Sequence, residues 1–492
     1  MSPIPRRPAI AGAAQFLQRV DDPREAREPI AMMEQALRDA ASDAGTPRLL
    51  EAIDTILVPQ GTWHYGDPAA LLAERVGAGS VETGIGIVSG HIVQVLVDWA
   101  CAEIAAGQRD VVAIVGGESE NSKRQLQKTG DWPTWNEEIP GEPDRRFGSY
   151  EGAFSQAEVD IGINKPSVCF ALCETALRAE RGATPAEHRR HISELSSRLS
   201  AVAAKNPHAW IQRHVSAEEI ATPTRANRMV SYPYTKLMTA NISVDQSAAL
   251  IVCSEETATR FGIAPERLVY LRAATQMNHA TLLSERRHLY EHPGMHVAGQ
   301  RVLELAGADA SDLAHVDLYS CFPFAVEAGA ASLGLDETRP LSVTGGLTFS
   351  GGPFGNYVIQ AKARMVELLR ADPGSLGLVG SLGGNFTKFA FGVYSSDPGT
   401  QAAPAMEDVS KTCAAMPTRP YRTGYTGGVR IESYSVDVLP AGPHRITFST
   451  LTEDGSRVWA SSDEPQLMDA LLADEDVCGR EAKVSGGRLE IG

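Results

Sequence analysis

Ser89, Gly90 and His91 lie where a glycine-rich loop meets a strongly apolar segment, and their residue types could support chemistry. Apolar residues from 93 to 104 fall on almost every helical face, which predicts a helix that is buried all round. The start of such a helix has unpaired N–H groups and a positive dipole end. This position is therefore predicted to suit an anion, an oxyanion or a nucleophile.

Ser89 is the candidate nucleophile, and a serine needs a base to become one. His91 is close in sequence, but side chains two residues apart point in different directions, so a Ser89–His91 dyad requires an unusual loop. The alternative is that His91 is a helix-start residue whose ring bonds a backbone group. The sequence leaves both interpretations open.

A second glycine cluster, TGGLTFSGGPFGN at 344–356, has the same kind of surroundings as the first. The predicted elements follow the same order in both places. A helix comes first, then a strand that begins near an aspartate (Asp54 or Asp317), a glycine-rich helix start, a second helix and a strand with a glycine pair. This repetition predicts an internally duplicated α/β unit with layered sheets and helices.

The composition changes twice along the chain. Residues 120–150 are polar and rich in Pro and Trp, which predicts a loop or an excursion from the core, continued by helices at 168–181 and 184–204. The tail has short β-branched runs separated by turns, which is typical of a small barrel. The predicted division has five parts: a first half (1–119 and 236–256), a loop domain (120–235), a second half (257–400), a linker (401–415) and an OB-like barrel (416–492).

The overall charge argues against a nucleic-acid or anionic-membrane surface, because the formal net charge is −16. Tyr434, Phe448 and Trp459 could stack bases, but the tail is itself acidic. No apolar run is long enough to span a membrane, so a soluble cytoplasmic protein is expected. The seven cysteines are scattered without a CxxC motif; the Cys169–Cys173 spacing is interpreted as core packing, and no metal is predicted.

Five segments give the chain a resemblance to the thiolase fold, and specifically to thiolase-like proteins of type 1, which have an appended barrel. They are NRMVSYPYTKLM at 227–238 with VDQSAALIVCS at 244–254, DLYSCFPFAV at 317–326, VTGGLTFSGGPFGNYV at 343–358 and SLGGNFTKFAFGVYS at 381–395. The resemblance implies a layered α/β/α/β/α duplication with a helical loop domain and a small C-terminal β-barrel.

Thiolases act on C–C bonds next to an acyl-CoA thioester with two cysteines and two histidines. At the matching positions this chain has Gly90, Tyr319, Gly352 and Ser381. Cys101 lies about 16 Å along the helix from Gly90 at about 1.5 Å per residue, so it cannot replace the nucleophile. The resemblance thus implies an acyltransferase-like, acyl-CoA-binding protein without the covalent cysteine route.

Tyr319 is the remaining candidate acid, because a phenol with a pKa of about 10 is a hydrogen-bond donor at neutral pH. The alternative is that it only fills the space of the missing histidine. Asn356 and Asn385, on the glycine loops, could complete an oxyanion site or could be turn residues. Related thiolase-fold retro-aldolases also use a tyrosine, so a C–C lyase that uses Tyr319 is an alternative function.

The loop domain corresponds to the part of thiolases that holds coenzyme A. Its candidate phosphate-binding residues include Lys205, His208 and Lys236. The expected ligand is coenzyme A or an acyl-CoA, with no covalently bound cofactor, and the expected state is a monomer or homodimer. A non-catalytic acyl-CoA-binding scaffold is the second functional hypothesis.

Overall fold

The first half of the chain forms a six-stranded sheet in a computed structural model that describes residues 6–133, 135, 139–149, 154–279 and 281–491. The strand order is β1-β8-β4-β2-β3-β5. The bounds are β1 (Pro8–Leu17), β2 (Thr55–Pro59), β3 (Glu82–Gly86), β4 (Val111–Ser119), β5 (Arg145–Phe147) and β8 (Asp245–Ser254). β8 is antiparallel to both β1 and β4, whereas β4, β2, β3 and β5 run parallel.

A second sheet repeats this arrangement in the order β10-β11-β12-β9-β13. The bounds are β9 (Tyr270–Met277), β10 (Leu313–Asp317), β11 (Leu376–Gly383), β12 (Lys388–Ser395) and β13 (Ala405–Asp408). In this sheet the parallel pair β10–β11 is followed by the antiparallel pairs β11–β12 and β12–β9. The first sheet has the same pattern: the parallel pair β2–β4 is followed by the antiparallel pairs β4–β8 and β8–β1. The duplication expected from the glycine clusters is therefore present in the topology.

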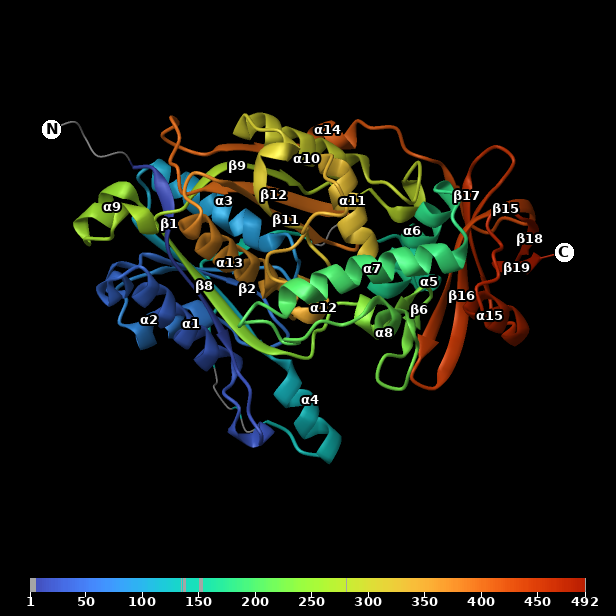
Figure 1. The fold of residues 1–492 in the computed structure, drawn as a ribbon, viewed down its shortest axis with the longest axis horizontal. Coiled ribbons are helices and arrows are strands. Elements are labelled where there is room, and N and C mark those ends of the chain that lie inside the picture. Colours follow the sequence, from blue (N-terminus) through green and yellow to red (C-terminus); the bar gives the residue numbers. More distant parts are fainter. Residues whose placement is uncertain (1–5, 134, 136–138, 150–153, 280, 492) are drawn as a thin grey trace.

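Helices form the layers between and outside the sheets (Figure 1). α3 (Ile92–Ala105) and α13 (Tyr357–Ala371) lie between the sheets, where each contacts strands of both. The outer layers are formed by α1 (Pro29–Asp43) with α2 (Pro68–Val76), and by α10 (Pro293–Ala306) with α11 (Pro323–Leu333). Short helices α9 (Glu255–Arg260) and α12 (Gly346–Phe349) complete the two halves. The all-round burial predicted for residues 93–104 follows from this central position.

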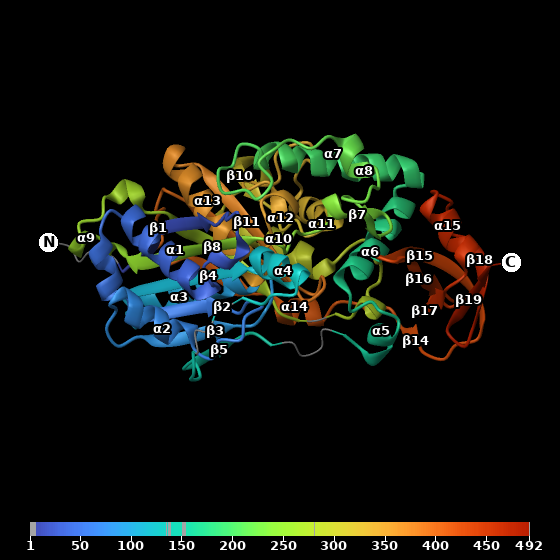
Figure 2. The same ribbon diagram turned by 90° about the horizontal axis from the view of Figure 1, so that it is seen from below.

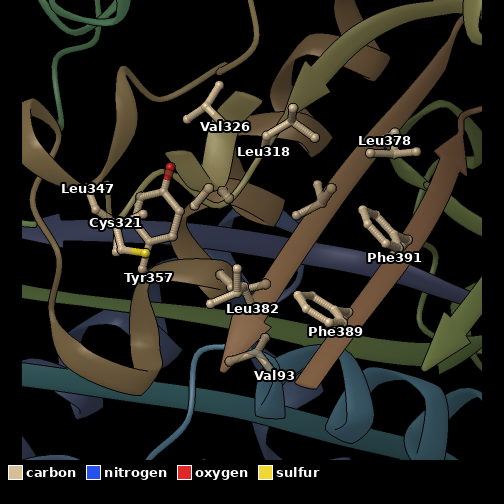
Figure 3. Close-up of a cluster of buried hydrophobic side chains, with 14 of the residues drawn as sticks. Val93, Leu318, Cys321, Val326, Leu347, Tyr357, Leu378, Leu382, Phe389 and Phe391 are labelled. Carbon is tan, nitrogen blue, oxygen red and sulfur yellow. The ribbon is translucent and has the colours of Figure 1, made fainter. Parts of the chain in front are cut away.

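The second half has an apolar core that reaches the central layer. Leu378 and Leu382 of β11, Phe389 and Phe391 of β12 and Val93 of α3 are buried side chains of one cluster (Figure 3). Close packing of this kind fixes the positions of the loops at the strand ends. Those loops surround the cavity described below.

Residues 120–150 contain more regular structure than their polar composition indicated, whereas the helices expected at 168–181 and 184–204 are present. The first part of the expected loop is the helix α4 (Glu120–Thr129), and β5 extends the first sheet; part of the DWPTWNEEIPGEPDRRFG segment lies outside the described residues. Further elements are α5 (Gln156–Asp160), α6 (Pro166–Glu180), α7 (Pro185–Ala203), α8 (Ala217–Ala221), β6 (Met229–Ser231) and β7 (Tyr234–Thr235). α4 has few buried apolar residues, which is why its sequence resembles a loop.

The C-terminal region is a closed five-stranded barrel at one end of the molecule (Figure 2). Its strands are β15 (Gly427–Leu439), β16 (Gly442–Leu451), β17 (Arg457–Ser462), β18 (Glu481–Ser485) and β19 (Arg488–Ile491), with β14 (Tyr421–Arg422) and the helix α15 (Pro465–Leu472) alongside. β15 also pairs with β6 through Asp437 and Ser231. The barrel is thereby joined to the segment that returns to the core.

The segment 401–415, expected to be a linker, contains β13 and the helix α14 (Ser410–Ala414). β13 pairs with β9 in a parallel register and so forms the edge of the second sheet. An edge strand needs only one apolar face, and β13 alternates half-buried with exposed residues. The strand has only four residues and follows a segment rich in Pro, Gly and Ala, so its alternation could not be recognised in the sequence.

Candidate active site

A cavity of about 330 Å³ lies at the start of α3, between the two halves of the chain. Ser89 and Gly90 line it from the first half, and Tyr319 and Gly352 from the second. Most other lining side chains are apolar: Phe170, Val230, Ile242, Cys321, Phe322, Leu347, Phe354 and Leu382. Cys321, Leu347 and Leu382 are labelled in Figure 3. Such a cavity suits an apolar group held beside a few polar atoms.

Ser89, His91 and Asn278 form a continuous hydrogen-bonded chain next to this cavity. Ser89 Oγ lies 2.7 Å from His91 Nδ1, and His91 Nε2 lies 3.0 Å from Asn278 Oδ1. The ring therefore bonds two side chains, not the backbone group that was the alternative from sequence. The two side chains converge because the backbone turns at Gly90 and His91 before α3 begins.

The bond to Asn278 determines the roles of the two imidazole nitrogens. An amide oxygen only accepts, so His91 Nε2 carries the proton and Nδ1 is left to accept the Ser89 hydroxyl proton. The Asn278 amide group lies 3.4 Å from Gln276 Oε1, which is consistent with this orientation. Burial, with a smaller contribution from Lys388, lowers the pKa of His91 to about 4, so the ring is neutral at pH 7.

A pH dependence of stability follows from this burial. Because the folded pKa of about 4 lies below the ordinary 6.5, His91 stabilises the fold fully above pH 6.5 and loses that contribution as the pH falls towards 4. The shift corresponds to roughly 3 kcal/mol at most. Urea unfolding at pH 7.5 and pH 4.5 should therefore show a smaller loss of stability for His91→Gln than for the unaltered chain. An equal loss in both proteins would contradict the assignment.

Gly383 leaves room for the Ser89–His91 pair. A Cβ atom at this position would lie 1.9 Å from Ser89 Oγ and 2.8 Å from His91 Nδ1. The glycine pair that ends β11 is therefore needed for a close approach of two segments, which is one reason for glycine at a strand end.

Tyr319 occupies the space into which a side chain at position 90 would project. A Cβ atom on Gly90 would lie 2.4 Å from the Tyr319 hydroxyl oxygen and 2.2 Å from the backbone oxygen of Leu382. A nucleophilic cysteine at position 90 is thus sterically incompatible with this structure.

The Tyr319 hydroxyl is a candidate hydrogen-bond donor in the cavity. Among the described residues it has no hydrogen-bond partner, and neither do the backbone N–H groups of Gly90 and His91. Burial raises the pKa of Tyr319 far above its usual value of 10. The phenol therefore remains protonated and could donate to an oxygen but is a very poor base.

The other predicted site residues are divided between the cavity and its surroundings. Gly352 and Asn385 line the cavity, and the Asn385 amide donates to the backbone oxygen of Asn164 at 2.9 Å. Ser381 does not line it, since its hydroxyl donates to the backbone oxygen of Ala390 at 2.9 Å. Asn356 is also outside the lining, buried against Gly116. The Ser381 hydroxyl is thus satisfied within its sheet, whereas neither amide atom of Asn356 has a hydrogen-bond partner among the described residues.

A basic groove of about 740 Å³ adjoins the cavity. Val230, Thr239, Ala240 and Ile242 line both spaces. The groove has five cationic side chains and no carboxylate in its lining: Arg124, Lys128, Arg225, Arg228 and Lys236. Lys128, Arg225 and Lys236 have no ion pair with any described residue. In a chain of net charge −16, this local excess of positive charge would attract an anion.

Of the three predicted phosphate-binding candidates, only Lys236 lines the groove. Lys205 is exposed elsewhere, and the backbone oxygen of His208 accepts a hydrogen bond from Gln246. The sequence reasoning missed Lys128 and Arg225 because basic residues on surface helices and loops are usually only solvated. Asn278 was not predicted either. The one feature of the sequence that could have indicated it is that two polar residues, Asn278 and His279, directly follow a buried strand.

Comparison with known proteins identifies the family. A crystal structure of a monomeric SCP2-thiolase-like protein type 1 from Mycobacterium smegmatis is 30% identical, with a TM-score of 0.83, and the similarity covers 99% of each chain. The chain belongs to the SCP2-thiolase-like protein type 1 family. No family model matches it.

Two more distant proteins share parts of this thiolase-like chain. An acetyl-CoA acetyltransferase from Methanothermobacter thermautotrophicus is 24% identical over 262 residues, which is 48% of this chain and 65%, slightly under two thirds, of that protein. The Ltp2–ChsH2(DUF35) aldolase is 20% identical with a TM-score of 0.60, over 80% of this chain and 98% of that one. The aldolase similarity shows the shared fold.

A second polar cluster lies where α6, α7 and α11 meet in the thiolase-like chain. His188 Nε2 lies 2.6 Å from Glu174 Oε1, and Glu327 completes a group that could ligate a metal ion, although the sequence predicted none. Arg181 and His191 also pair with Glu327. These contacts give the cluster a structural role in joining the helical region to the second half.

Among the described residues, no helix has the length and apolarity needed to cross a membrane.

Proposed function

We propose that the protein binds an acyl-CoA thioester, with the acyl group and thioester in the cavity and the phosphates in the basic groove. The observation that carries this proposal is that the two spaces adjoin: the apolar cavity and the cationic, acid-free groove share four lining residues. An acyl-CoA has the matching sequence of groups, an apolar acyl chain, a polar linker and phosphates. The monomeric state of the Mycobacterium smegmatis protein supports the same state for this chain.

The thioester carbonyl would be polarised by donors at the inner end of the cavity. The Tyr319 hydroxyl and the N–H group of Gly90 belong to residues that line the cavity, and neither has a protein partner among the described residues. Donors of this kind stabilise an enolate or an oxyanion in a water-poor site. Enolate formation is the step that C–C bond chemistry next to a thioester requires, and it needs no acyl-cysteine.

The steric conflict at Gly90 argues against conventional thiolase activity. It also favours the non-catalytic binder as the second candidate, because the resemblance matches the two thiolase cysteines and two histidines to Gly90, Ser381, Tyr319 and Gly352. The retro-aldolase alternative needs a base, and a tyrosine whose pKa is raised by burial is a donor instead. Tyr319 would therefore assist such a reaction only as an acid.

A substrate panel tests the proposal. The full-length protein is incubated with 3-ketoacyl-CoA and 3-hydroxyacyl-CoA thioesters, and products are followed by mass spectrometry. Tyr319→Phe should lower turnover at least tenfold with little change in thermal stability, since one oxyanion donor contributes about 10²–10³ in rate in known enzymes. Tyr421→Phe, in the barrel region and outside the cavity lining, is the matched control.

Undiminished turnover in Tyr319→Phe would remove the role proposed for this residue. Binding of the thioesters without turnover of any of them would favour the non-catalytic binder. If neither coenzyme A nor its thioesters shift the melting temperature, the proposed ligand is wrong.

A further inference from the structure

We infer that Ser89, His91 and Asn278 are a nucleophile, a base and a positioning residue, and that the protein hydrolyses acyl-CoA thioesters through an acyl-serine. The inference rests on the proposed function for its substrate and goes beyond it in the reaction. It depends on the continuous chain from Ser89 Oγ to His91 Nδ1 at 2.7 Å and from His91 Nε2 to Asn278 Oδ1 at 3.0 Å.

The order of groups is that of an activated nucleophile. A serine becomes nucleophilic when a base accepts its proton and a third group orients that base. Here Asn278 holds the proton on Nε2, so the lone pair of Nδ1 faces the serine. A neutral Asn serves this orienting role in Cys-His-Asn proteases, so a carboxylate is not required.

The position of Ser89 and His91 relative to the cavity is a second, independent observation that supports this role. Ser89 lines the apolar cavity, whereas His91 is completely buried behind it. Gly383 leaves the space that the pair occupies, since any Cβ there would meet both Ser89 Oγ and His91 Nδ1. Gly90 and Tyr319 line the same cavity as Ser89, and the unpartnered N–H group of Gly90 and the hydroxyl of Tyr319 are the donors available to an oxyanion there.

The reaction is balanced with water as the co-reactant. Ser89 Oγ attacks the thioester carbonyl carbon while its proton passes to His91 Nδ1, and the carbonyl oxygen becomes the oxyanion. The C–S bond then breaks, and the leaving thiolate takes the proton from Nδ1. Water attacks the acyl-serine after giving a proton to Nδ1. Collapse of that intermediate returns the proton to Ser89 Oγ and releases the carboxylic acid.

The experiment measures release of free coenzyme A thiol from acetyl-CoA and octanoyl-CoA by the full-length protein, with no acyl acceptor other than water. Acid-quenched samples are examined for an acyl adduct on the peptide containing Ser89. Thermal shift with coenzyme A is measured in parallel for every variant. The unaltered protein should release thiol and show the adduct.

Ser89→Ala should lose at least 100-fold in thiol release and the adduct while its coenzyme A shift is unchanged. Gly383→Ala should lose activity as well, because its methyl group displaces Ser89. The matched control is Ser381→Ala, a serine on the same strand end whose hydroxyl bonds a backbone oxygen outside the cavity. It should stay within twofold of the unaltered protein.

Asn278 is tested by rescue. Asn278→Leu should lower kcat at least tenfold at constant KM, and Asn278→Asp should restore most of it, because Asp keeps the accepting oxygen. If Asn278 had only a structural role, kcat would not depend on whether residue 278 has an oxygen that accepts the His91 Nε2 proton.

The inference is overturned if coenzyme A binds but neither thioester is hydrolysed, or if Ser89→Ala retains the full rate. The absence of any coenzyme A shift would instead overturn the proposed function on which the inference rests.

Discussion

Replacing Arg457 by methionine is expected to lower the free energy of unfolding by about 3–5 kcal/mol, the range for breaking a buried ion pair. Arg457 is fully buried in the barrel and forms a two-bonded pair with Glu432, at 2.9 Å for each bond. Its remaining amino group donates to the backbone oxygens of Leu283, Ser284 and Arg286 in the second half. The methionine removes both hydrogen bonds to Glu432 and the side-chain donor of three backbone oxygens.

The same substitution should weaken acyl-CoA binding, because the barrel supports one wall of the cavity. Tyr232 N donates to Val436 O at 2.9 Å, and the Arg228 guanidinium donates to Val438 O at 2.8 Å. Val230, between them, lines both the cavity and the groove. These bonds give the barrel a supporting role in the ligand site.

Urea unfolding followed by circular dichroism, together with calorimetric titration of an acyl-CoA, measures both effects. Arg430→Met is the control, since Arg430 is exposed on β15 of the same barrel. Equal stability of the two variants would contradict the docking role of Arg457.

Gly90→Cys, which places a cysteine where the resemblance predicts the thiolase nucleophile, should destabilise the protein and yield no thiolase activity. The new Cβ would lie 2.4 Å from the Tyr319 hydroxyl and 2.2 Å from Leu382 O, and a backbone oxygen cannot move aside as a flexible side chain does. Overpacking of this kind costs about 1–3 kcal/mol, and sometimes more.

The control for this prediction is Gly352→Ala, at the position that the resemblance matches to a thiolase histidine. Its Cβ would have no neighbour nearer than 3.4 Å, so its loss of stability should be less than half that of Gly90→Cys. The comparison uses urea unfolding, and acetoacetyl-CoA cleavage is assayed in both proteins. A stable Gly90→Cys variant with thiolase activity would show that Tyr319 does not exclude the cysteine.

The fold could be predicted from the sequence because its signals are local and repeated. Glycine clusters before two apolar helices, and strands that end in glycine pairs, indicate the duplication directly. α4 and β13 could not be predicted in the same way. α4 is stabilised by few buried residues, and β13 is an edge strand of four residues whose pairing with β9 is distant in sequence.

The candidate site could be predicted only in part. Ser89, Gly90 and Tyr319 follow from motif positions, and all three line the cavity. The Ser89–His91 bond depends on the backbone turn at Gly90, and its third member, Asn278, comes from a loop 187 residues away from His91. Such convergence depends on tertiary packing, which spacing in the sequence does not reveal. The acid-free groove likewise combines side chains from α4 and from residues 211–243.

The central claim, that the cavity and the groove together hold an acyl-CoA, is tested most directly by one calorimetric comparison. A non-hydrolysable thioether analogue of octanoyl-CoA and the phosphate-bearing fragment 3′,5′-ADP are titrated into the unaltered protein and into Ala240→Trp. Ala240 lines both spaces, so the indole should close the passage between them. We predict one-to-one binding of the analogue that falls at least tenfold in Ala240→Trp, while binding of 3′,5′-ADP is retained. Equal affinity of both proteins for the analogue, or no binding to either, would contradict the account.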